Sequence, residues 1–403
     1  MRRPNVKKQK TSHENGDTPL HTAKPTAVFT PKGGRTHTLS IALPGSIVAN
    51  AHSPEQKTLL AGTIARALAV FCVDEVVIFD DDEGALRRRD SYPDDGDYDP
   101  IAKTSDELNA PGKGYTAYSD PSHFLAHLLS YLETPPYLRK HLFPMHPNLR
   151  TAGLLPSLDM PHHLRANEWC DYREGIVVGD LQQQNHCHPY GQNQYPRQRR
   201  RSDQSIQSDD SNTTVIDTGL SEKVVVPNVQ LPEHARVTVR FTQPGAPLAE
   251  PVDPSTPRAE AGYYWGYYVR RCRSLSSVFT ECPFDGGYDL SFGTSERGAP
   301  VGAVLEEDEG DPRERPPDFG HMLVVFGGVA GIENAVRNDP QLRDMAVRPS
   351  EAGKLFDYYV NLLPGQGSRT IRTEEAVWLG LTSLRGVADG TQHPKESYRY
   401  NGA

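Results

Sequence analysis

Apolar and polar positions near the start of the chain predict a strand, a helix and a second strand. Residues 38–44 alternate and stop at a proline, which is typical of a strand. The sequence Ser-Pro-Glu-Gln at residues 53–56 is the signature of a capped helix start, and apolar residues then recur at helical spacing to about Cys72. Residues 75–80 form an apolar run that ends in acid, as a buried parallel strand does. The pattern predicts a βαβ unit.

A second helix is predicted to begin at Asp120 and to break at the Pro135–Pro136 pair, with a short helix beyond it. From about Glu174 the period changes to that of short strands, at residues 175–179, 223–226 and 235–241. We therefore expect a small OB-like β-barrel, of a kind that often binds nucleic acid, inserted into an α/β domain.

Several segments lack apolar periodicity and are predicted to be loops or tails. Residues 1–34 form a basic tail, predicted to be disordered, and 391–403 a second tail. The α/β domain would comprise residues 35–173, with an acidic loop at 81–119, and residues 262–390. The barrel would span 174–261, with a disordered loop at 180–214 that is rich in Gln, Asn, Ser and Arg.

Residues 263–271 are rich in aromatic side chains and end in two arginines. The favoured interpretation is a core strand through which the chain returns to the α/β domain. A surface on which RNA bases stack is the alternative, because arginines follow the aromatic residues.

Three later strands are each predicted to end in a polar turn bounded by glycine. The turns are residues 293–298, the Gly327–Gly328 pair and residues 364–367. The last strand is expected to stop at Leu363, and Thr373 to cap a helix that runs to Gly386. Because ligands of open α/β sheets bind outside the carboxyl ends of strands, three such turns predict a cofactor pocket.

Composition narrows the classes of protein. The 403 residues carry a net charge of −9, 36% hydrophobic residues, 34 glycines and 34 prolines, which indicates a folded body with long loops. Five cysteines without a CxxC pair argue against a disulfide scaffold or a zinc site, and His162–His163 lacks partners at metal-ligand spacing. No dinucleotide fingerprint, P-loop or GxSxG motif is present, and no apolar run of about 18 residues predicts a membrane helix.

Several stretches resemble the SPOUT-class RNA methyltransferases, and most closely their eukaryotic and archaeal subgroup, the centromere protein 32 family. The resemblance spans about residues 34–386 and is most specific in the last two stretches. In chain order, the similar stretches are Arg-Thr-His-Thr-Leu-Ser-Ile-Ala-Leu-Pro-Gly-Ser at 35–46, Phe-Cys-Val-Asp-Glu at 71–75, Pro-Tyr-Leu-Arg-Lys at 136–140, Ala-Gly-Leu-Leu-Pro at 152–156, Gly-Thr-Ser-Glu-Arg-Gly at 293–298 and Pro-Gly-Gln-Gly-Ser-Arg-Thr-Ile-Arg-Thr-Glu-Glu-Ala at 364–376.

The resemblance implies an α/β sheet whose C-terminal part forms a trefoil knot, with S-adenosylmethionine bound in the knot and two knots packed as a homodimer. The inserted barrel would hold RNA, with ribosomal RNA as the expected substrate and the nucleus or nucleolus, and also the cytoplasm, as the expected location. No metal and no membrane are expected. The residues expected to bind the cofactor are Thr294, Arg297, Gly327, Gly328, Asn361, Leu362, Leu363, Gly365, Gln366, Ser368 and Ile371.

Methyl transfer to uridine N3, favoured here over the ribose 2′-oxygen, needs a group that takes a proton. Glu296 is the favoured candidate base, and Glu374 is the alternative. The groups expected to hold phosphate or a developing oxyanion are Arg35, Arg297 and Arg372. Each of these residues has a plainer interpretation as a structural salt bridge or a helix cap. We expect Arg297→Ala or Gly365→Val to abolish methyl transfer.

Two other classes of protein stay open on the sequence alone. A non-catalytic RNA-binding or scaffolding protein would keep the barrel and the basic segments without a cofactor pocket. An unrelated α/β enzyme could bind a different nucleotide cofactor. Stabilisation by S-adenosylmethionine distinguishes the three, because a bound ligand adds stability only where a pocket exists.

Overall fold

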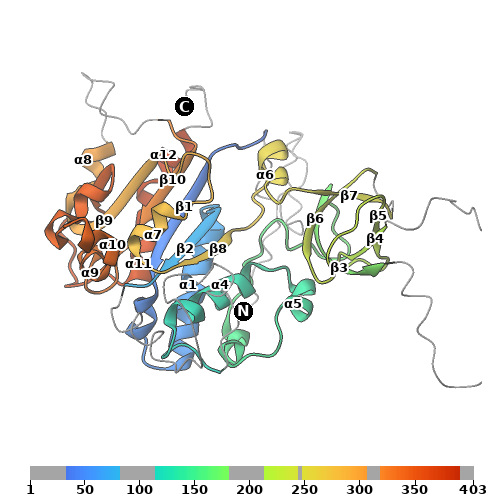
Figure 1. The fold of residues 1–403 in the computed structure, drawn as a ribbon, viewed down its shortest axis with the longest axis horizontal. Coiled ribbons are helices and arrows are strands. Elements are labelled where there is room, and N and C mark those ends of the chain that lie inside the picture. The colour runs from blue at the N-terminus through green and yellow to red at the C-terminus, as the bar shows by residue number, and fades with distance from the viewer. Residues whose placement is uncertain (1–32, 82–113, 181–212, 244–246, 306–317, 391–403) are drawn as a thin grey trace, which may run out of the picture.

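The computed structural model describes residues 33–81, 114–180, 213–243, 247–305 and 318–390. The tails predicted at 1–34 and 391–403 lie almost wholly outside these residues, as do most of the acidic loop at 81–119 and of the polar loop at 180–214. Figure 1 shows two bodies of structure: a parallel sheet covered by helices, and a smaller antiparallel sheet beside it.

The larger body is built on a 6-stranded sheet in which every pair of neighbouring strands is parallel. Strand β1 pairs with β2, and Ser40 lies opposite Glu75. Helix α1 (Pro54–Val70) connects the two strands, so the predicted βαβ unit is confirmed. Across the sheet the strands are β11 (Tyr358–Asn361), β9 (Leu290–Pro300), β10 (His321–Val325), β1 (Thr38–Pro44), β2 (Glu75–Phe79) and β8 (Tyr268–Cys272).

Helices cover both faces of this sheet, and each face has its own apolar core. Side chains that alternate along each strand supply the two cores: Ile41 faces one and Ala42 the other. The first face is covered by α1, α4 (Pro121–Glu133) and α11 (Thr373–Ser383), with α8 (Val301–Leu305) and α12 (Arg385–Gly390) at its margin. The second face is covered by α7 (Leu275–Thr280), α9 (Ile332–Asn338), α10 (Pro340–Asp344) and the 3₁₀ helix η6 (Pro349–Leu355).

The predicted starts of the first two helices are confirmed. At α1 the Gln56 backbone N–H donates to Ser53 Oγ at 3.2 Å, and the Ser53 N–H donates to Gln56 Oε1 at 3.3 Å. Asp120 caps α4 by accepting from the His123 N–H at 2.9 Å. A proline pair ends α4 and leads into α5 (Pro136–Leu142), and the irregular stretch beyond it contains the 3₁₀ turns η2 (Pro147–Leu149) and η3 (Ala152–Leu154).

The second sheet has 5 strands in an antiparallel arrangement around a small apolar core. A bridge between Val225 and Leu248 brings its two edges together, so the sheet is close to a closed barrel. In spatial order the strands are β5 (Val224–Val226), β4 (Thr214–Asp217), β3 (Tyr172–Asp180), β6 (Arg236–Phe241) and β7 (Ala249–Val252), and α6 (Thr256–Ala261) follows β7. Strands β4 and β7 were not predicted, because β4 follows directly on a polar segment and β7 contains Pro251.

The aromatic segment is a corner and not one long strand. The strand predicted over 263–271 begins only at Tyr268, because Gly266 has φ +90° and turns the chain before it. Tyr264, Trp265 and Tyr267 are buried, which confirms their assignment to the core. The hydroxyls of Tyr264 and Tyr267 donate to the backbone carbonyls of Val73 and Leu129, at 2.9 and 3.0 Å.

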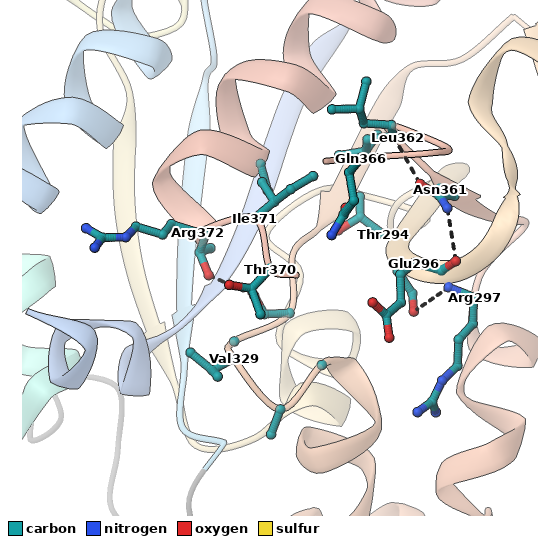
Figure 2. Close-up of a pocket in the computed structure, with 18 of the residues that line it drawn as sticks. Thr294, Glu296, Arg297, Val329, Asn361, Leu362, Gln366, Thr370, Ile371 and Arg372 are labelled. Carbon is teal, nitrogen blue, oxygen red and sulfur yellow. Dashed lines mark hydrogen bonds between the residues drawn. The ribbon is translucent and has the colours of Figure 1, made fainter. Parts of the chain in front are cut away.

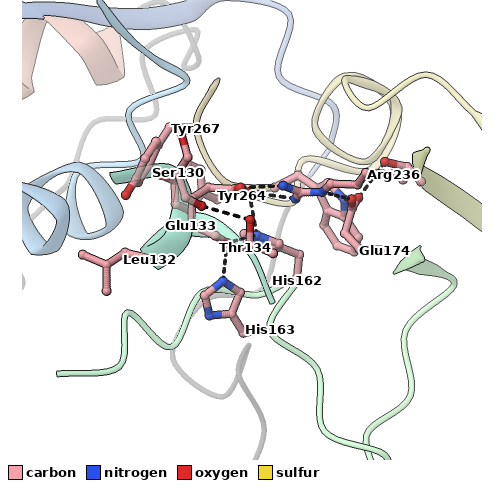
Figure 3. A network of polar contacts seen from close by, with 12 residues as sticks. Ser130, Leu132, Glu133, Thr134, His162, His163, Glu174, Arg236, Tyr264 and Tyr267 are labelled. Carbon is pink, nitrogen blue, oxygen red and sulfur yellow. Dashed lines mark hydrogen bonds and ion pairs between the residues drawn. The ribbon is translucent and has the colours of Figure 1, made fainter. Parts of the chain in front are cut away.

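A network of charged side chains joins the smaller sheet to helix α4 of the larger body (Figure 3). Arg236 of β6 reaches Glu133 of α4 through two hydrogen bonds of 2.6 and 2.9 Å, and Glu174 of β3 through one of 2.7 Å. Burial opposes ionisation of both carboxyls, but the guanidinium outweighs it, so the pKa values of Glu133 and Glu174 lie below their ordinary range. Trp265 Nε1 donates to Glu174 Oε1 at 2.7 Å and closes the network.

Candidate active site

A cavity of about 510 Å³ opens at the carboxyl ends of the parallel strands. Its walls are the end of β9, the turn after β10 and the loop between β11 and α11, together with Asn50 at the end of the 3₁₀ helix η1 (Gly45–Asn50). Figure 2 shows the side chains of Glu296, Gln366 and Thr370 directed toward the space between these segments. The strand order places them together, since β9, β10 and β11 lie side by side in parallel. The predicted convergence of three strand ends is therefore present.

The β9 wall differs from the turn that was predicted at residues 293–298. Strand β9 continues to Pro300, but its pairing with β11 shifts: Gly293 lies opposite Tyr359, and Ala299 lies opposite Val360. Residues 294–298 therefore bulge out of the sheet, and residues 294–297 line the cavity. The hydroxyl of Thr294 fixes the start of the bulge by donating to the Val325 carbonyl at 3.1 Å.

The glycine turn after β10 leaves almost no room for side chains. A Cβ on Gly327 would lie 2.7 Å from the backbone nitrogen of Ile332, so only glycine fits there. Gly331 has φ +75°, and its N–H donates to the Gly328 carbonyl at 3.0 Å, which closes the turn before α9. The backbone of residues 327–331 thus forms a side of the cavity.

Asn361 connects the β9 bulge to the loop that follows β11. Its Nδ2 donates to the Glu296 carbonyl at 3.0 Å, and its Oδ1 accepts from the Leu363 N–H at 3.0 Å. β11 therefore ends at Asn361, before the predicted end at Leu363. The Leu363 N–H bonds to the Asn361 side chain instead of to a neighbouring strand. Within the loop, Gln366 Nε2 donates to the Ser368 carbonyl at 3.0 Å.

Helix α11 starts at Thr373 as predicted, but Thr373 is not its cap. Arg372 occupies the N-cap position, and its N–H donates to Glu375 Oε2 at 2.9 Å. Thr373 instead donates its hydroxyl hydrogen to the Gly327 carbonyl at 3.0 Å, which ties α11 to the glycine turn. α11 ends at Ser383, and a separate helix follows where one helix to Gly386 was expected.

The two glutamates at the start of α11 have different roles. Glu375 is an exposed capping residue. Glu374 is buried, with its Oε1 3.8 Å from Arg372 Nη1 and its Oε2 without a hydrogen-bond partner. Glu374 is not among the residues that line the cavity, so the structure does not place it where a base would act.

Charges of both signs surround the cavity. Arg297 is 69% exposed and pairs with Glu333 at 3.0 Å, and the hydroxyl of Tyr359 lies 3.4 Å from the same Glu333 oxygen. Burial raises the pKa of Tyr359, so this hydroxyl stays protonated near neutral pH. Arg369 and Arg372 add positive charge at the opposite wall. Such a site suits a ligand that itself carries both positive and negative groups.

The structure brings most of the predicted site residues together. Those that line the cavity are Thr294, Glu296, Arg297, Gly327, Gly328, Asn361, Leu362, Leu363, Gln366, Ile371 and Arg372. Gly365 and Ser368 lie in the same loop but do not face the cavity. Asn50, Glu333 and Arg369 also line the cavity but were not predicted as site residues. Asn50 follows the end of β1, so the position after a strand end, which identified the other residues, could have identified it too.

Arg35 does not belong to this site. It precedes β1, at the amino end of the parallel sheet, whereas the cavity lies at the carboxyl end. Its guanidinium binds Asp74 through two hydrogen bonds of 2.7 and 2.6 Å. The plainer interpretation of Arg35 as a structural ion pair therefore holds.

Metal-ligand clusters and membrane-spanning helices are absent from the part of the chain that the structure describes. No cluster of His, Cys, Asp and Glu residues there could hold a metal ion. No helix among the described residues is both long and apolar enough to cross a membrane.

The parallel sheet with its cavity at the strand ends has the architecture of an α/β enzyme. The sequence profile of the family described as “Putative RNA methyltransferase” matches residues 38–384. The chain belongs to this family, and it is a methyltransferase enzyme.

Named relatives are similar over most of the chain. The 28S rRNA (uridine-N(3))-methyltransferase of Homo sapiens is 42% identical over 367 residues, which cover 89% of this chain and 81% of the human protein. The Mus musculus protein of the same name is 40% identical over 357 residues, 87% of this chain and 77% of its own length. The Drosophila melanogaster protein of that name is 38% identical over 352 residues, 86% of this chain and 62% of its own length.

Proposed function

We propose that this enzyme transfers a methyl group from S-adenosylmethionine to N3 of a uridine in large-subunit ribosomal RNA. The observation that carries the proposal is the cavity formed by three strand ends in a chain that is 42% identical to a 28S rRNA (uridine-N(3))-methyltransferase. The cavity has room for a nucleoside-sized ligand, and a family resemblance alone would be a weak guide to the substrate.

The residues of the cavity fit S-adenosylmethionine. Its amino-acid end carries both charges, which Glu333 and the arginines at 297, 369 and 372 can complement. The exposed backbone of residues 361–371 offers N–H and C=O groups to a purine ring, and Leu362 and Ile371 offer apolar contacts beside them. When bound, the cofactor supplies an electrophilic methyl group.

The chain's own contribution to the reaction is positioning, exclusion of water and acceptance of one proton. The carboxyl group of Glu296 faces the cavity and can take a proton there, as the sequence suggested (Figure 2). Arg297 and Arg372 are exposed at the rim, where they can bind an RNA phosphate.

We further propose the SPOUT-type trefoil knot and the homodimer that the family resemblance implies. The path of the C-terminal segment supports the knot: β11 is an edge strand beside β9, whereas α11 packs against α1 and bonds to the turn after β10. Exposed Val329 and Leu363 beside the cavity would suit a covered surface in a dimer. The inserted sheet would hold RNA, and the nucleus or nucleolus, with the cytoplasm in addition, is the proposed location.

The proposal is tested on the purified full chain and in cells that lack the gene. S-adenosylhomocysteine at about a hundred times its Kd should stabilise the chain by about 2–3 kcal/mol, measured as a shift in denaturant midpoint. Large-subunit RNA from the deletion strain should lack one 3-methyluridine. A chain that gains no stability at millimolar ligand, with the RNA modification intact, would be a non-catalytic RNA-binding protein instead.

A further inference from the structure

A second cavity, of about 300 Å³, lies at the carboxyl ends of β1 and β2, next to the cofactor cavity. We call it the base pocket. The short η1 helix separates the two: Asn50 faces the cofactor cavity, and Ala49 and Ala51 face the base pocket. Its lining carries both aromatic and polar groups: Ser46, His52, Lys57, Asp80, Asp81, Tyr118 and Ser122.

The carboxyl group of Asp81 lies at the boundary between the two cavities. Ser46 Oγ donates to Asp81 Oδ2 at 2.6 Å, and the Ser46 N–H donates to Asp81 Oδ1 at 3.3 Å. A Cβ placed on Gly328, which lines the cofactor cavity, would lie 3.1 Å from that hydroxyl and 3.3 Å from Asp81 Oδ2. The main chain of Asp81 is held as well, because its carbonyl accepts from the side chains of Asn334 and Asn338 at 3.1 and 2.8 Å.

The lining of the base pocket also includes an aromatic ring and a buried cation. Tyr118 is 60% exposed, so a face of its ring is open to a ligand. Lys57 Nζ lies 5.0 Å from the centre of that ring. The same Nζ donates to the carbonyls of Val48 and Ala51 at 2.6 and 2.7 Å, which fixes the η1 wall between the two cavities.

We propose that the base pocket receives the target uracil, with its ring on Tyr118 and its N3–H directed at the carboxylate of Asp81. This inference rests on the proposed function and adds the substrate side of the site. A base must leave its stack to be modified, and enzymes read such a base by stacking and by hydrogen bonds to its edge. The base pocket offers both kinds of contact next to the cavity proposed for the cofactor.

In this inference Asp81, and not Glu296, is the base that takes the N3 proton. Its carboxylate accepts the N3 proton while the N3 electron pair forms the new bond to the methyl carbon of S-adenosylmethionine. The carbon–sulfur bond breaks, and its electrons remain on sulfur as the neutral thioether. Burial raises the pKa of Asp81, although the bonds from Ser46 limit the rise, so Asp81 is a stronger base than an exposed aspartate.

The same contact explains a preference for uracil. Uracil presents an N3–H donor, which a carboxylate accepts, whereas cytosine presents an unprotonated N3 that a carboxylate repels. Asp81 therefore selects the base as well as activating it, a dual role that Glu296 in the cofactor cavity would not have.

The binding test uses the full chain saturated with S-adenosylhomocysteine and two labelled RNA probes, short oligouridine and short oligocytidine. Asp81→Asn keeps the size of the side chain and an acceptor for Ser46, and it should abolish the preference for oligouridine. Tyr118→Ala should weaken oligouridine binding roughly 5- to 150-fold, the range expected for one lost base stack, and Tyr118→Phe should restore it. Asp344→Asn, on the exposed surface of α10, is the matched control for charge and should bind like the unmodified chain.

The kinetic test uses ribosomal RNA from cells that lack the gene. Asp81→Asn should lose methyl transfer near neutral pH and regain part of it in alkaline buffer, where N3 loses its proton without help. Activity that is equal to that of the unmodified chain at neutral pH would exclude Asp81 as the proton acceptor.

The outcomes separate this inference from the proposed function. If S-adenosylhomocysteine does not bind the unmodified chain, the proposed function fails. If it binds, and Asp81→Asn keeps both the uracil preference and the rate, the cofactor assignment stands and the base pocket is refuted. Tyr118→Ala with unchanged oligouridine affinity would refute the stacking contact.

Discussion

At the scale of single residues, the loop between β11 and α11, residues 362–372, holds two glycines of different character. Gly365 has φ +75°, a conformation that residues with a Cβ adopt only at a cost. Gly367 has no positive φ, and a Cβ on either residue would meet open space. The two positions therefore differ in backbone conformation and not in room for a side chain.

We predict that Gly365→Ala weakens cofactor binding and that Gly367→Ala does not. The strain at position 365 costs about 1–2 kcal/mol, which displaces the loop and lowers S-adenosylhomocysteine affinity roughly tenfold. Isothermal titration calorimetry on both variants measures this difference. Equal affinities would show that the loop reaches its binding conformation without a left-handed residue, and the expected loss of activity in Gly365→Val would then have no basis.

Hydrogen-bond partners were predicted correctly where they are close to each other in the sequence. Ser53 and Gln56 are three positions apart, so the capping box of α1 was visible in the sequence. Arg35 was misplaced because its partner Asp74 lies 39 positions away, and only the pairing of β1 with β2 brings the region together. Thr373 is a residue type that often caps helices, but its hydroxyl bonds to the Gly327 carbonyl, and Arg372 occupies the N-cap position instead.

At the scale of elements, β9 shows why the apolar and polar pattern of one segment is insufficient to predict the structure of that segment. Its apolar half predicted a strand, and its polar half predicted a turn. The polar half bulges out of the sheet, but the strand resumes beyond it, because β11 pairs with both ends of the bulge. A long-range partner thus decided the structure, whereas β10 and its glycine turn, which depend on local backbone freedom, were predicted correctly.

The end of helix α4 provides a test of stability against pH. The Glu133 carbonyl accepts from His162 Nε2 at 3.0 Å and from His163 Nε2 at 2.6 Å, and both histidines are buried. Burial lowers the pKa of His163 to about 3, well below the value of about 6.5 in an unfolded chain. The unfolded state therefore binds a proton that the folded state does not, and stability falls as the pH drops below about 6.5.

We predict that the melting temperature falls steadily between about pH 6.5 and pH 4.5, and that His163→Gln makes the fall shallower. Glutamine keeps an N–H for the Glu133 carbonyl but does not titrate. Differential scanning calorimetry of both proteins across this range gives the two slopes. His37 and His127, whose pKa values burial also lowers to about 4, are present in both and cancel. Parallel slopes would contradict the prediction.

At the scale of the whole molecule, we propose that the relation between the two sheets governs how RNA reaches the site. The sequence indicated an inserted β-sheet but could not show how it attaches. Arg236, Glu133 and Glu174 lie in three separate stretches of the chain, and the charge network appears only when β3 and β6 meet the end of α4 (Figure 3). Since the cofactor cavity lies wholly in the larger body, the network can affect RNA binding without touching the cofactor.

Two arginines on β6 make this separation testable. Arg236 joins two buried carboxylates, whereas Arg240 pairs with Glu250 and Glu260 at 3.4 and 3.1 Å on the surface. We predict that Arg236→Ala lowers the free energy of unfolding by about 3–5 kcal/mol, because it leaves buried charges uncompensated. The matched change Arg240→Ala should cost less than about 1 kcal/mol, since exposed ion pairs contribute little. Denaturant titration of the two variants measures both values.

The same two substitutions should also differ in their effect on RNA binding. The KM for ribosomal RNA should rise in Arg236→Ala, because the inserted sheet is no longer held against the larger body, while the Kd for S-adenosylhomocysteine stays that of the unmodified chain. Arg240→Ala should change neither constant. A parallel loss of cofactor and RNA binding in Arg236→Ala would mean that the network supports the whole fold, and the inserted sheet would then not act as a separately attached RNA-binding unit.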